Sequence, residues 1–167
     1  MSEYDLRPVR HDDAARIADI YNHFVSNTAI SFEEEIVSPR EIVARIDGIV
    51  GTGMPWLVAQ REGVVLGYAY AAKWRERRAY RFTAECTIYT CPDSDVRGAG
   101  SALYGALFPS LRQSGHRSVI AVIALPNPAS IALHERFGMK KVAHYSEVGF
   151  KFGKWHDVGH WQAMLQA

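Results

Sequence analysis

The chain has 167 residues, of which 48% are hydrophobic and 22% charged, and its formal net charge is +1. This length suffices for one domain with its own core, and the near-neutral charge excludes the basic face of a nucleic-acid-binding protein. No apolar segment reaches the length of a signal core or membrane span, and Cys86 and Cys91 lack the spacing of metal ligands. We therefore expect one cytoplasmic domain over residues 1–167, with free thiols, no metal, no nucleic-acid partner and no membrane contact.

The first half of the chain predicts a strand, two helices and a hairpin. Ser38 and Glu41 form a capping box around Pro39 and mark the start of the second helix. Glu62-Gly63 separates two apolar runs and predicts the hairpin turn. In chain order these elements span 4–10, 11–27, 38–50, 55–61 and 63–74.

The second half alternates strands with helices and ends in two strands. Pro109 lies inside the first helix and is expected to kink it or to split off its last turn. Asn127 and Gly138 are typical of the start and the end of the second helix. The elements span 80–90, 98–115, 117–125, 127–138, 140–150 and 155–166. The order β-α-α-β-β-β-α-β-α-β-β predicts a mixed α/β layer protein.

The segment CPDSDVRGAGSALYGAL, residues 91–107, joins a strand to a helix through a glycine-rich loop. The free N–H groups and the helix dipole at such a junction suit an anion. The Lys-Ser/Thr pair of a phosphate-binding P-loop is absent, and the mid-chain position does not suit a dinucleotide fingerprint. Either an anion site or a turn that lets the helix pack on the strand explains the glycines.

The run Pro92…Gly98-Ala99-Gly100-Ser101-Ala102-Leu103 resembles the acetyl-CoA loop of the GCN5-related N-acetyltransferases, the GNAT superfamily. A closer resemblance, to the phosphinothricin and methionine sulfone or sulfoximine branch, rests on IADIYNHFVSNTAISFEEE, YRFTAECTIY, SVIAVIALPN, LHERFGM and GFKFGKWHDVGHWQ. The resemblance implies an α+β fold with a central mixed, mostly antiparallel sheet of about seven strands flanked by about four helices. It also implies acetyl-CoA as co-substrate. Asp95 departs from the family loop, which usually has Gln or Arg there.

The resemblance assigns the coenzyme contacts to two segments and one side chain. Backbone N–H groups of the loop would hold the pyrophosphate, and the backbone of a splayed strand would pair with the pantetheine arm. Asn127 would hydrogen-bond the pantetheine, cap a helix, or do both. The segments comprise Val96, Arg97, Gly98, Ala99, Gly100 and Ser101, and Thr87, Ile88, Tyr89 and Thr90.

Acetyl transfer to an amine needs a base, because an ammonium is protonated at neutral pH. The resemblance makes Glu85 this general base; the alternative is a strand carboxylate paired with Arg81. It also makes His134 a catalytic histidine, although its apolar neighbours suit a structural one. Tyr104 and His134 both remain candidates for the acid that protonates the thiolate.

The acceptor's carboxylate needs a cation, and arginine suits bidentate recognition. The resemblance places Arg75 and Arg77 at the acceptor, where the alternative is a solvated basic loop. Phe32 and Tyr80 are candidate pocket walls beside Glu85, whereas 33–35 is expected to be solvated. The C-terminal hairpin is expected to carry aromatic packing and a homodimer surface that completes the pocket.

These features predict an N-acetyltransferase that acetylates the α-amine of a small amino-acid-like substrate of the phosphinothricin, methionine sulfoximine or methionine sulfone type. The amine would attack the thioester directly. Two alternatives stay open. One is a GNAT enzyme for another amine, such as a polyamine, an aminoglycoside or a protein N-terminus, and the other is a non-catalytic acyl-CoA-binding module.

Overall fold

The computed structural model describes residues 4–95 and 97–165. Its strands form one seven-stranded sheet, as the resemblance implied, and their order is β1-β2-β3-β4-β5-β7-β6. The β4–β5 pair is parallel and all other neighbouring pairs are antiparallel. The strands are β1 (Asp5–Pro8), β2 (Trp56–Arg61), β3 (Val64–Lys73), β4 (Thr83–Thr90), β5 (Ser118–Ala124), β6 (Lys140–Lys151) and β7 (Lys154–Met164).

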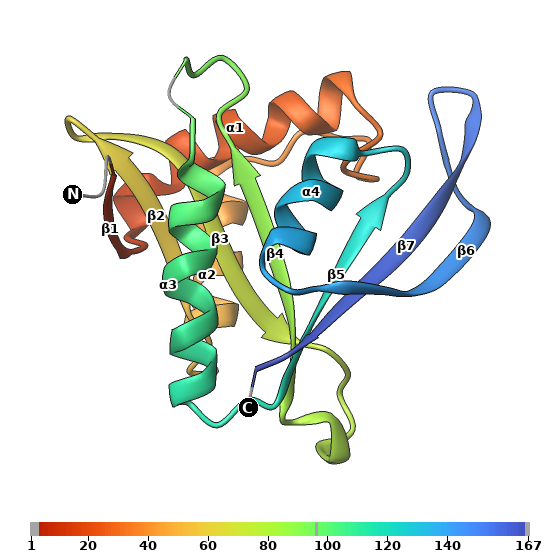
Figure 1. Cartoon of the computed structure of the whole chain (residues 1–167). Coiled ribbons are helices and arrows are strands. Elements are labelled where there is room, and N and C mark those ends of the chain that lie inside the picture. The colour runs from red at the N-terminus through yellow and green to blue at the C-terminus, as the bar shows by residue number, and fades with distance from the viewer. Residues whose placement is uncertain (1–3, 96, 166–167) are drawn as a thin grey trace.

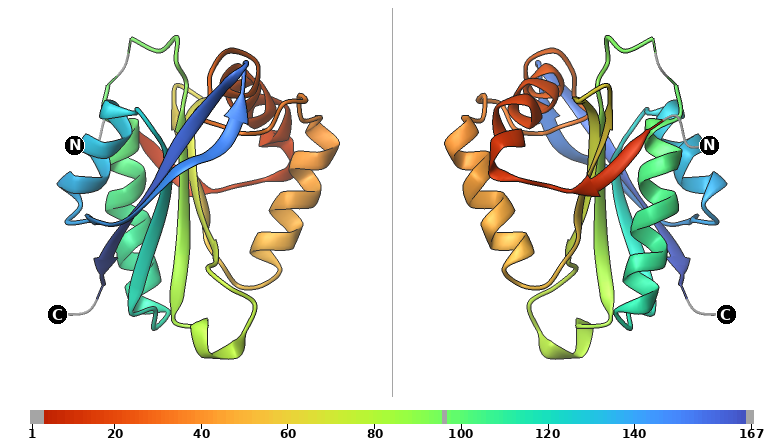
Figure 2. Two further views of the ribbon diagram at one scale, coloured as in Figure 1. Left: turned by 90° about the vertical axis from the view of Figure 1, so that its right-hand side faces the viewer. Right: turned by 90° about the vertical axis from the view of Figure 1, so that its left-hand side faces the viewer.

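Helices cover both faces of this sheet (Figures 1 and 2). They are α1 (Ala14–Asn27), α2 (Pro39–Val50), α3 (Ala99–Gln113) and α4 (Pro128–Arg136), with 3-10 turns at His11–Asp13 and Arg78–Tyr80. One core joins α1 and α2 to β2 and β3 around Ile17, Ile46 and Val58. The other packs α3 against the centre of the sheet through Leu103 and Val119. Each such fully buried aliphatic side chain contributes about 1.5–3 kcal/mol.

The local signals of the first half are confirmed. The Ser38 hydroxyl accepts from the Glu41 amide at 3.2 Å, and the Glu41 carboxylate accepts from the Ser38 amide at 2.8 Å. Glu62 and Gly63 have φ angles of 52° and 80°, the left-handed pair that a two-residue hairpin turn requires. The possibility that Pro109 splits off the last turn of α3 is wrong, because the helix runs through it to Gln113.

Strands β4 and β5 separate soon after they meet. Their register comprises Thr83↔Ser118, Ala84↔Val119 and Glu85↔Ile120 only, whereas β4 stays paired to β3 as far as Thr90. The diverging strands are visible in Figure 1. The edge of residues 86–90 that faces β5 therefore lacks a strand partner within the described part of the chain. Its backbone groups are free to pair with a ligand, as the expected splay requires.

The hairpin of β6 and β7 extends beyond the rest of the sheet (Figure 1). It carries large exposed side chains that include Phe150, Phe152 and Trp155, and the rings of Phe150 and Trp155 lie 4.9 Å apart. Exposed aromatic groups gathered in this way are typical of a contact surface. Within residues 4–95 and 97–165, no helix has the length and apolar character needed to cross a membrane.

Candidate active site

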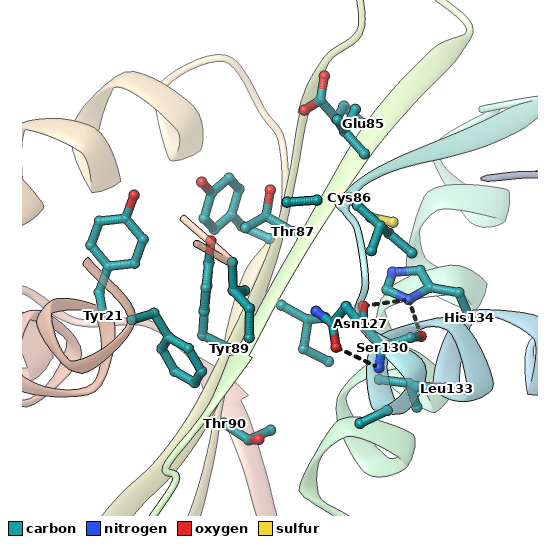
Figure 3. A pocket seen from close by; sticks show the side chains of 18 residues that line it. Tyr21, Glu85, Cys86, Thr87, Tyr89, Thr90, Asn127, Ser130, Leu133 and His134 are labelled. Atoms are coloured by element: carbon teal, nitrogen blue, oxygen red, sulfur yellow. Dashed lines mark hydrogen bonds between the residues drawn. The ribbon is translucent and has the colours of Figure 1, made fainter. Parts of the chain in front are cut away.

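A cavity of about 420 Å³ opens where β4 leaves β5 (Figure 3). One wall is β4 itself, and α4 with the turn before it forms the other. The cavity brings together candidate residues of β4 and of the segment that begins α4. They are Glu85, Thr87, Ile88, Tyr89, Thr90, Asn127 and His134.

The glycine-rich loop borders a smaller cavity of about 270 Å³, which Arg97, Gly98, Ala99 and Gly100 line from one side. Gly98 has a φ angle of 98° at the start of α3, a conformation that favours glycine. A Cβ at Gly100 would lie 2.9 Å from Cδ2 of Leu133. The glycines therefore serve both a turn and close packing, and the first amides of α3, which have no partner inside the helix, belong to residues that line this cavity.

The remaining loop residues have separate environments. The Ser101 hydroxyl accepts a hydrogen bond from Nη1 of Arg136 at 3.2 Å, which brings a cation from α4 to the start of α3. Sequence reasoning missed Arg136 because it follows a helix pattern with no sign of a phosphate contact. Asp95 is exposed. Val96 lies outside the described residues.

Glu85 is half-buried and lies at the edge of the cavity (Figure 3). Burial raises the pKa of this carboxyl, and the positive charge of Arg75 opposes the rise. The alternative of a Glu85–Arg81 pair is wrong: Arg81 donates to the Arg78 carbonyl at 3.2 Å and stacks on the Phe82 ring. A half-buried carboxylate with a raised pKa suits a general base.

Glu85 also borders a second cavity of about 420 Å³ on the side of α2. Its other lining residues include Arg45, Tyr70 and Thr87. Phe32 lines a further cavity of about 460 Å³, next to Tyr21 and Tyr89. Glu85 therefore lies between the β4–β5 opening and the α2 side of the sheet.

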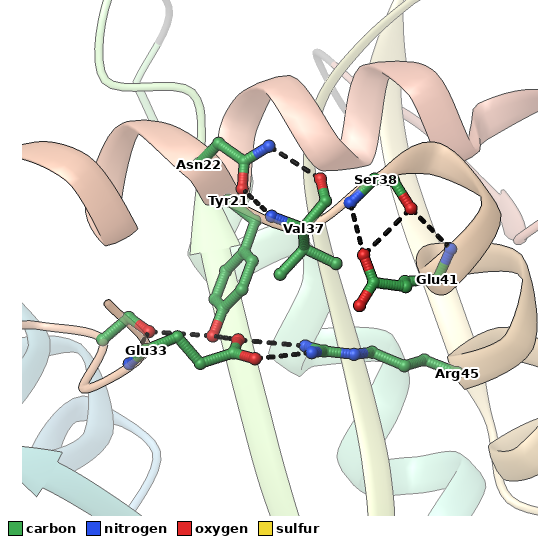
Figure 4. Close-up of polar contacts among 8 residues, drawn as sticks. Tyr21, Asn22, Glu33, Val37, Ser38, Glu41 and Arg45 are labelled. Atoms are coloured by element: carbon green, nitrogen blue, oxygen red, sulfur yellow. Dashed lines mark hydrogen bonds and ion pairs between the residues drawn. The ribbon is translucent and has the colours of Figure 1, made fainter. Parts of the chain in front are cut away.

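A polar network that sequence reasoning missed supports these walls (Figure 4). Arg45 donates to the two carboxylate oxygens of Glu33 at 2.6 and 3.1 Å, and the Tyr21 hydroxyl donates to the same carboxylate. Burial raises the pKa of Tyr21 to about 12. The expectation that Glu33 is solvated surface is thus wrong, although Glu34 and Glu35 are exposed. The available signal was that Tyr21 and Arg45 interrupt the apolar faces of their helices.

The predicted acceptor arginines lie in the loop between β3 and β4. Arg75 stacks over the Trp74 ring at 4.3 Å and is near enough to Glu85 to affect its pKa. Arg77 precedes the 3-10 turn that contains Tyr80, and Tyr80 is exposed. Arg75, Arg77 and Tyr80 line none of the four cavities described above. Their roles stay predictions.

His134 is buried, and both of its ring nitrogens have partners. Nδ1 lies 2.7 Å from the Ser130 carbonyl oxygen, and Nε2 lies 2.8 Å from the Tyr104 hydroxyl. Because a carbonyl only accepts, Nδ1 carries the hydrogen and Nε2 accepts from Tyr104. Burial lowers the pKa of this imidazole. The Tyr104 hydroxyl also lies 3.4 Å from Sγ of buried Cys86.

Asn127 begins α4 by accepting from the Ser130 amide at 3.2 Å, so its capping role is confirmed. It also lines the β4–β5 cavity, where a contact with the pantetheine stays a prediction. In the hairpin, Asp157 accepts from Nε2 of His144 at 2.7 Å and from the Glu147 amide at 2.8 Å. Among the residues described, no group of three or more His, Cys, Asp or Glu side chains can hold a metal ion.

Comparisons with known proteins agree with this geometry. A family model described as an acetyltransferase (GNAT) domain matches residues 6–160. The phosphinothricin N-acetyltransferase of Streptomyces viridochromogenes is 40% identical over 158 residues, covering 95% of this chain and 86% of that protein. The L-methionine sulfoximine/L-methionine sulfone acetyltransferase of Salmonella typhimurium is 35% identical, covering 92% and 90%. The structure of a phosphinothricin acetyltransferase from Sinorhizobium meliloti in complex with AcCoA matches with a TM-score of 0.93 at 38% identity, covering 98% of this chain and 89% of that chain.

Proposed function

The chain belongs to the GNAT family and is an acetyl-CoA-dependent N-acetyltransferase of the phosphinothricin and methionine sulfoximine branch, and from this premise we propose that it acetylates the α-amine of a small amino-acid-like acceptor. In the proposed reaction the amine nitrogen forms a bond to the thioester carbon, and the carbon–sulfur bond breaks. The coenzyme leaves as a thiolate, which takes up a proton to become the thiol, and a base on the enzyme accepts the proton that the amine loses.

The position of Glu85 is the observation that carries this proposal. Its carboxylate borders both the β4–β5 cavity and the cavity on the α2 side, so a base there reaches an amine on one side and a thioester on the other. Its raised pKa makes it a better proton acceptor near neutral pH. We assign the general base to Glu85, acting directly or through one water.

We propose that the coenzyme lies along the open edge of β4 and against the start of α3. The unpaired backbone of residues 87–90 would hydrogen-bond the amide groups of the pantetheine arm, with Asn127 opposite. The first amides of α3, from Gly98 to Ser101, together with Arg97, would bind the pyrophosphate. The divergence of β4 from β5 and the left-handed Gly98 support this assignment.

We propose that Arg75 binds the acceptor's carboxylate, because it is the predicted arginine whose charge reaches Glu85. Phe32 would form an apolar wall, and Arg77 and Tyr80 would approach the acceptor from the same loop as Arg75. His134 lines the cavity beside Cys86. A direct catalytic role for His134 stays a prediction, and its engaged ring nitrogens favour the role of an oriented wall residue.

We also propose that the enzyme is a homodimer whose interface includes the exposed face of the β6–β7 hairpin. Phe150 and Trp155 are 55% and 61% exposed. Large apolar side chains that are exposed side by side are typical of a protein–protein interface. A partner subunit seated there would cover these side chains.

A thiol-release assay with acetyl-CoA tests the proposed function. The acceptors are phosphinothricin, methionine sulfoximine, methionine sulfone and, as the contrasting class, polyamines and an aminoglycoside. We expect release with the first group and little with the second, since a polycation is repelled by Arg75. Release with polyamines alone would overturn the proposed acceptor class.

A further inference from the structure

Lys151, at the end of β6, is a charged residue with only 2% of its surface exposed. Its Nζ donates hydrogen bonds of 2.7 Å to the carbonyl oxygens of Val25 and Ser31. Burying an ammonium group costs free energy unless its hydrogens meet acceptors. These two carbonyls are its acceptors, and both belong to a part of the chain more than a hundred residues away in sequence.

The two carbonyls mark the end of α1 and the segment that follows it. Val25 lies in the last turn of α1, where carbonyl groups lack partners inside the helix and the helix dipole favours a cation. Ser31 lies in residues 28–37, the segment that joins α1 to α2. Lys151 thus attaches the C-terminal hairpin to both at a single point.

A second contact joins the same parts of the molecule. The ring of Phe32 rests against β6 at Gly149, where an added Cβ would lie 2.3 Å from a ring atom. Because only glycine leaves room for the ring, the position of Phe32 depends on β6, the strand whose last residue is Lys151. Phe32, Ser31 and Glu33 together line the cavity beside Tyr21.

A series of polar contacts leads from Lys151 toward Glu85. The hydroxyl of Ser31 lies 2.8 Å from that of Tyr21, which also donates to Glu33. Glu33 in turn pairs with Arg45. Arg45 borders the same cavity as Glu85, so the series ends at the side of the sheet proposed for the acceptor.

From these contacts we propose that Lys151 is a positioning residue for the acceptor site. It holds residues 28–37, with Phe32 and Glu33, in the place where they form the acceptor's wall. The inference rests on the proposed function only in taking this side of Glu85 as the acceptor side. The coenzyme contacts proposed on β4 and α3 do not involve Lys151. Replacing Lys151 should therefore weaken the binding of the acceptor and leave the binding of acetyl-CoA unchanged.

The test replaces Lys151 with Met, which keeps the length of the side chain and removes the ammonium. Lys154→Met is the matched control, because Lys154 is exposed on the same hairpin. We expect Lys151→Met to raise the acceptor KM roughly tenfold or more and to leave the acetyl-CoA KM within about twofold. Amide hydrogen exchange in residues 28–37 should become faster in this variant only.

Faster exchange without a change in acceptor KM would overturn the proposal and leave Lys151 a purely structural residue. An equal rise in both KM values would overturn it as well. If Lys151→Met does not fold, Ser31→Ala removes the link to Tyr21 and should raise the acceptor KM in the same direction by a smaller factor; an unchanged acceptor KM would then contradict the proposal. If the wild-type enzyme acetylates no amine, the proposed function is overturned. Amide hydrogen exchange in residues 28–37 would still decide whether Lys151 holds that segment in place.

Discussion

The hydroxyl of Tyr104 lies 2.8 Å from Nε2 of His134, and both side chains are buried. The carbonyl of Ser130 accepts from the other ring nitrogen. Protonating His134 would add a hydrogen to Nε2, which now accepts the hydrogen bond from Tyr104. The pair therefore holds the imidazole neutral, in one tautomer and one orientation.

A neutral buried histidine makes stability depend on pH. Burial lowers the pKa of His134 from its ordinary value of 6.5, so below that pH the unfolded chain binds a proton that the folded chain does not. The free energy of unfolding should fall as pH drops from 6.5, by at most about 1.4 kcal/mol per pH unit from this group. Urea unfolding at pH 7.5, 6.5 and 5.5 measures this free energy of unfolding.

The matched variants are His134→Gln and His116→Gln. The stability difference between wild type and His134→Gln should shrink as pH falls, since the variant lacks the titrating group. His116 lies in the turn between α3 and β5, and His116→Gln should keep the wild-type pH dependence. Parallel curves for wild type and His134→Gln would show that His134 is not held neutral.

Glu85→Gln should cut turnover by roughly 10²–10⁴, the range for losing a general base. Because its side chain keeps the same shape, acetyl-CoA should bind with nearly unchanged affinity, measured by isothermal titration calorimetry. Glu76→Gln, at an exposed position of the β3–β4 loop, is the control and should be fully active. Full activity of Glu85→Gln would remove Glu85 from the mechanism.

The charge of Arg75 should set the acid side of the pH–activity profile. Arg75 lowers the pKa of Glu85 against the effect of burial, so Arg75→Leu should raise that pKa. The acid limb of kcat, measured at saturating acceptor, should therefore move to higher pH. Arg81→Leu removes a charge that has no contact with Glu85 and should leave the limb in place. A shift to lower pH in Arg75→Leu would contradict this electrostatic role.

The sequence predicted most of the elements because their signals are local. The Ser38–Glu41 capping box, the Glu62-Gly63 turn and the Asn127 cap each depend on residues a few positions apart. The residues along β4 followed from alternation on one strand and from the family resemblance.

The contacts that sequence reasoning missed join distant segments. Glu33 reads as part of an acidic surface run, and only its pairing with Arg45 and Tyr21 shows otherwise. Lys151 reads as one more hairpin lysine, since its carbonyl acceptors lie on α1 and the segment after it. Main-chain acceptors leave no side-chain pattern, so no spacing rule could find them.

The homodimer proposal predicts a mass of twice 18.7 kDa for the wild type in size-exclusion chromatography with light scattering. Trp155→Glu places a charge on the exposed hairpin face and should shift the protein to monomer. The control is Val64→Glu at the β2–β3 turn, which is similarly exposed at 51% and should not change the mass. A monomeric wild type at working concentration would contradict the proposal.

The N-cap glycine of α3 and a glycine inside that helix should respond to alanine in opposite directions. Gly98 begins α3 with a φ of 98°, a conformation that costs an alanine roughly 1–2 kcal/mol, and its amide lies at the proposed pyrophosphate site. Gly98→Ala should therefore lower the free energy of unfolding and raise the acetyl-CoA KM. Gly105 lies inside α3 with nothing within 4 Å of an added Cβ, so Gly105→Ala should stabilise the protein by roughly 0.5–1 kcal/mol at unchanged KM. Urea unfolding and steady-state kinetics on both variants decide it, and a Gly98→Ala enzyme with wild-type acetyl-CoA KM would show that this loop does not hold the coenzyme.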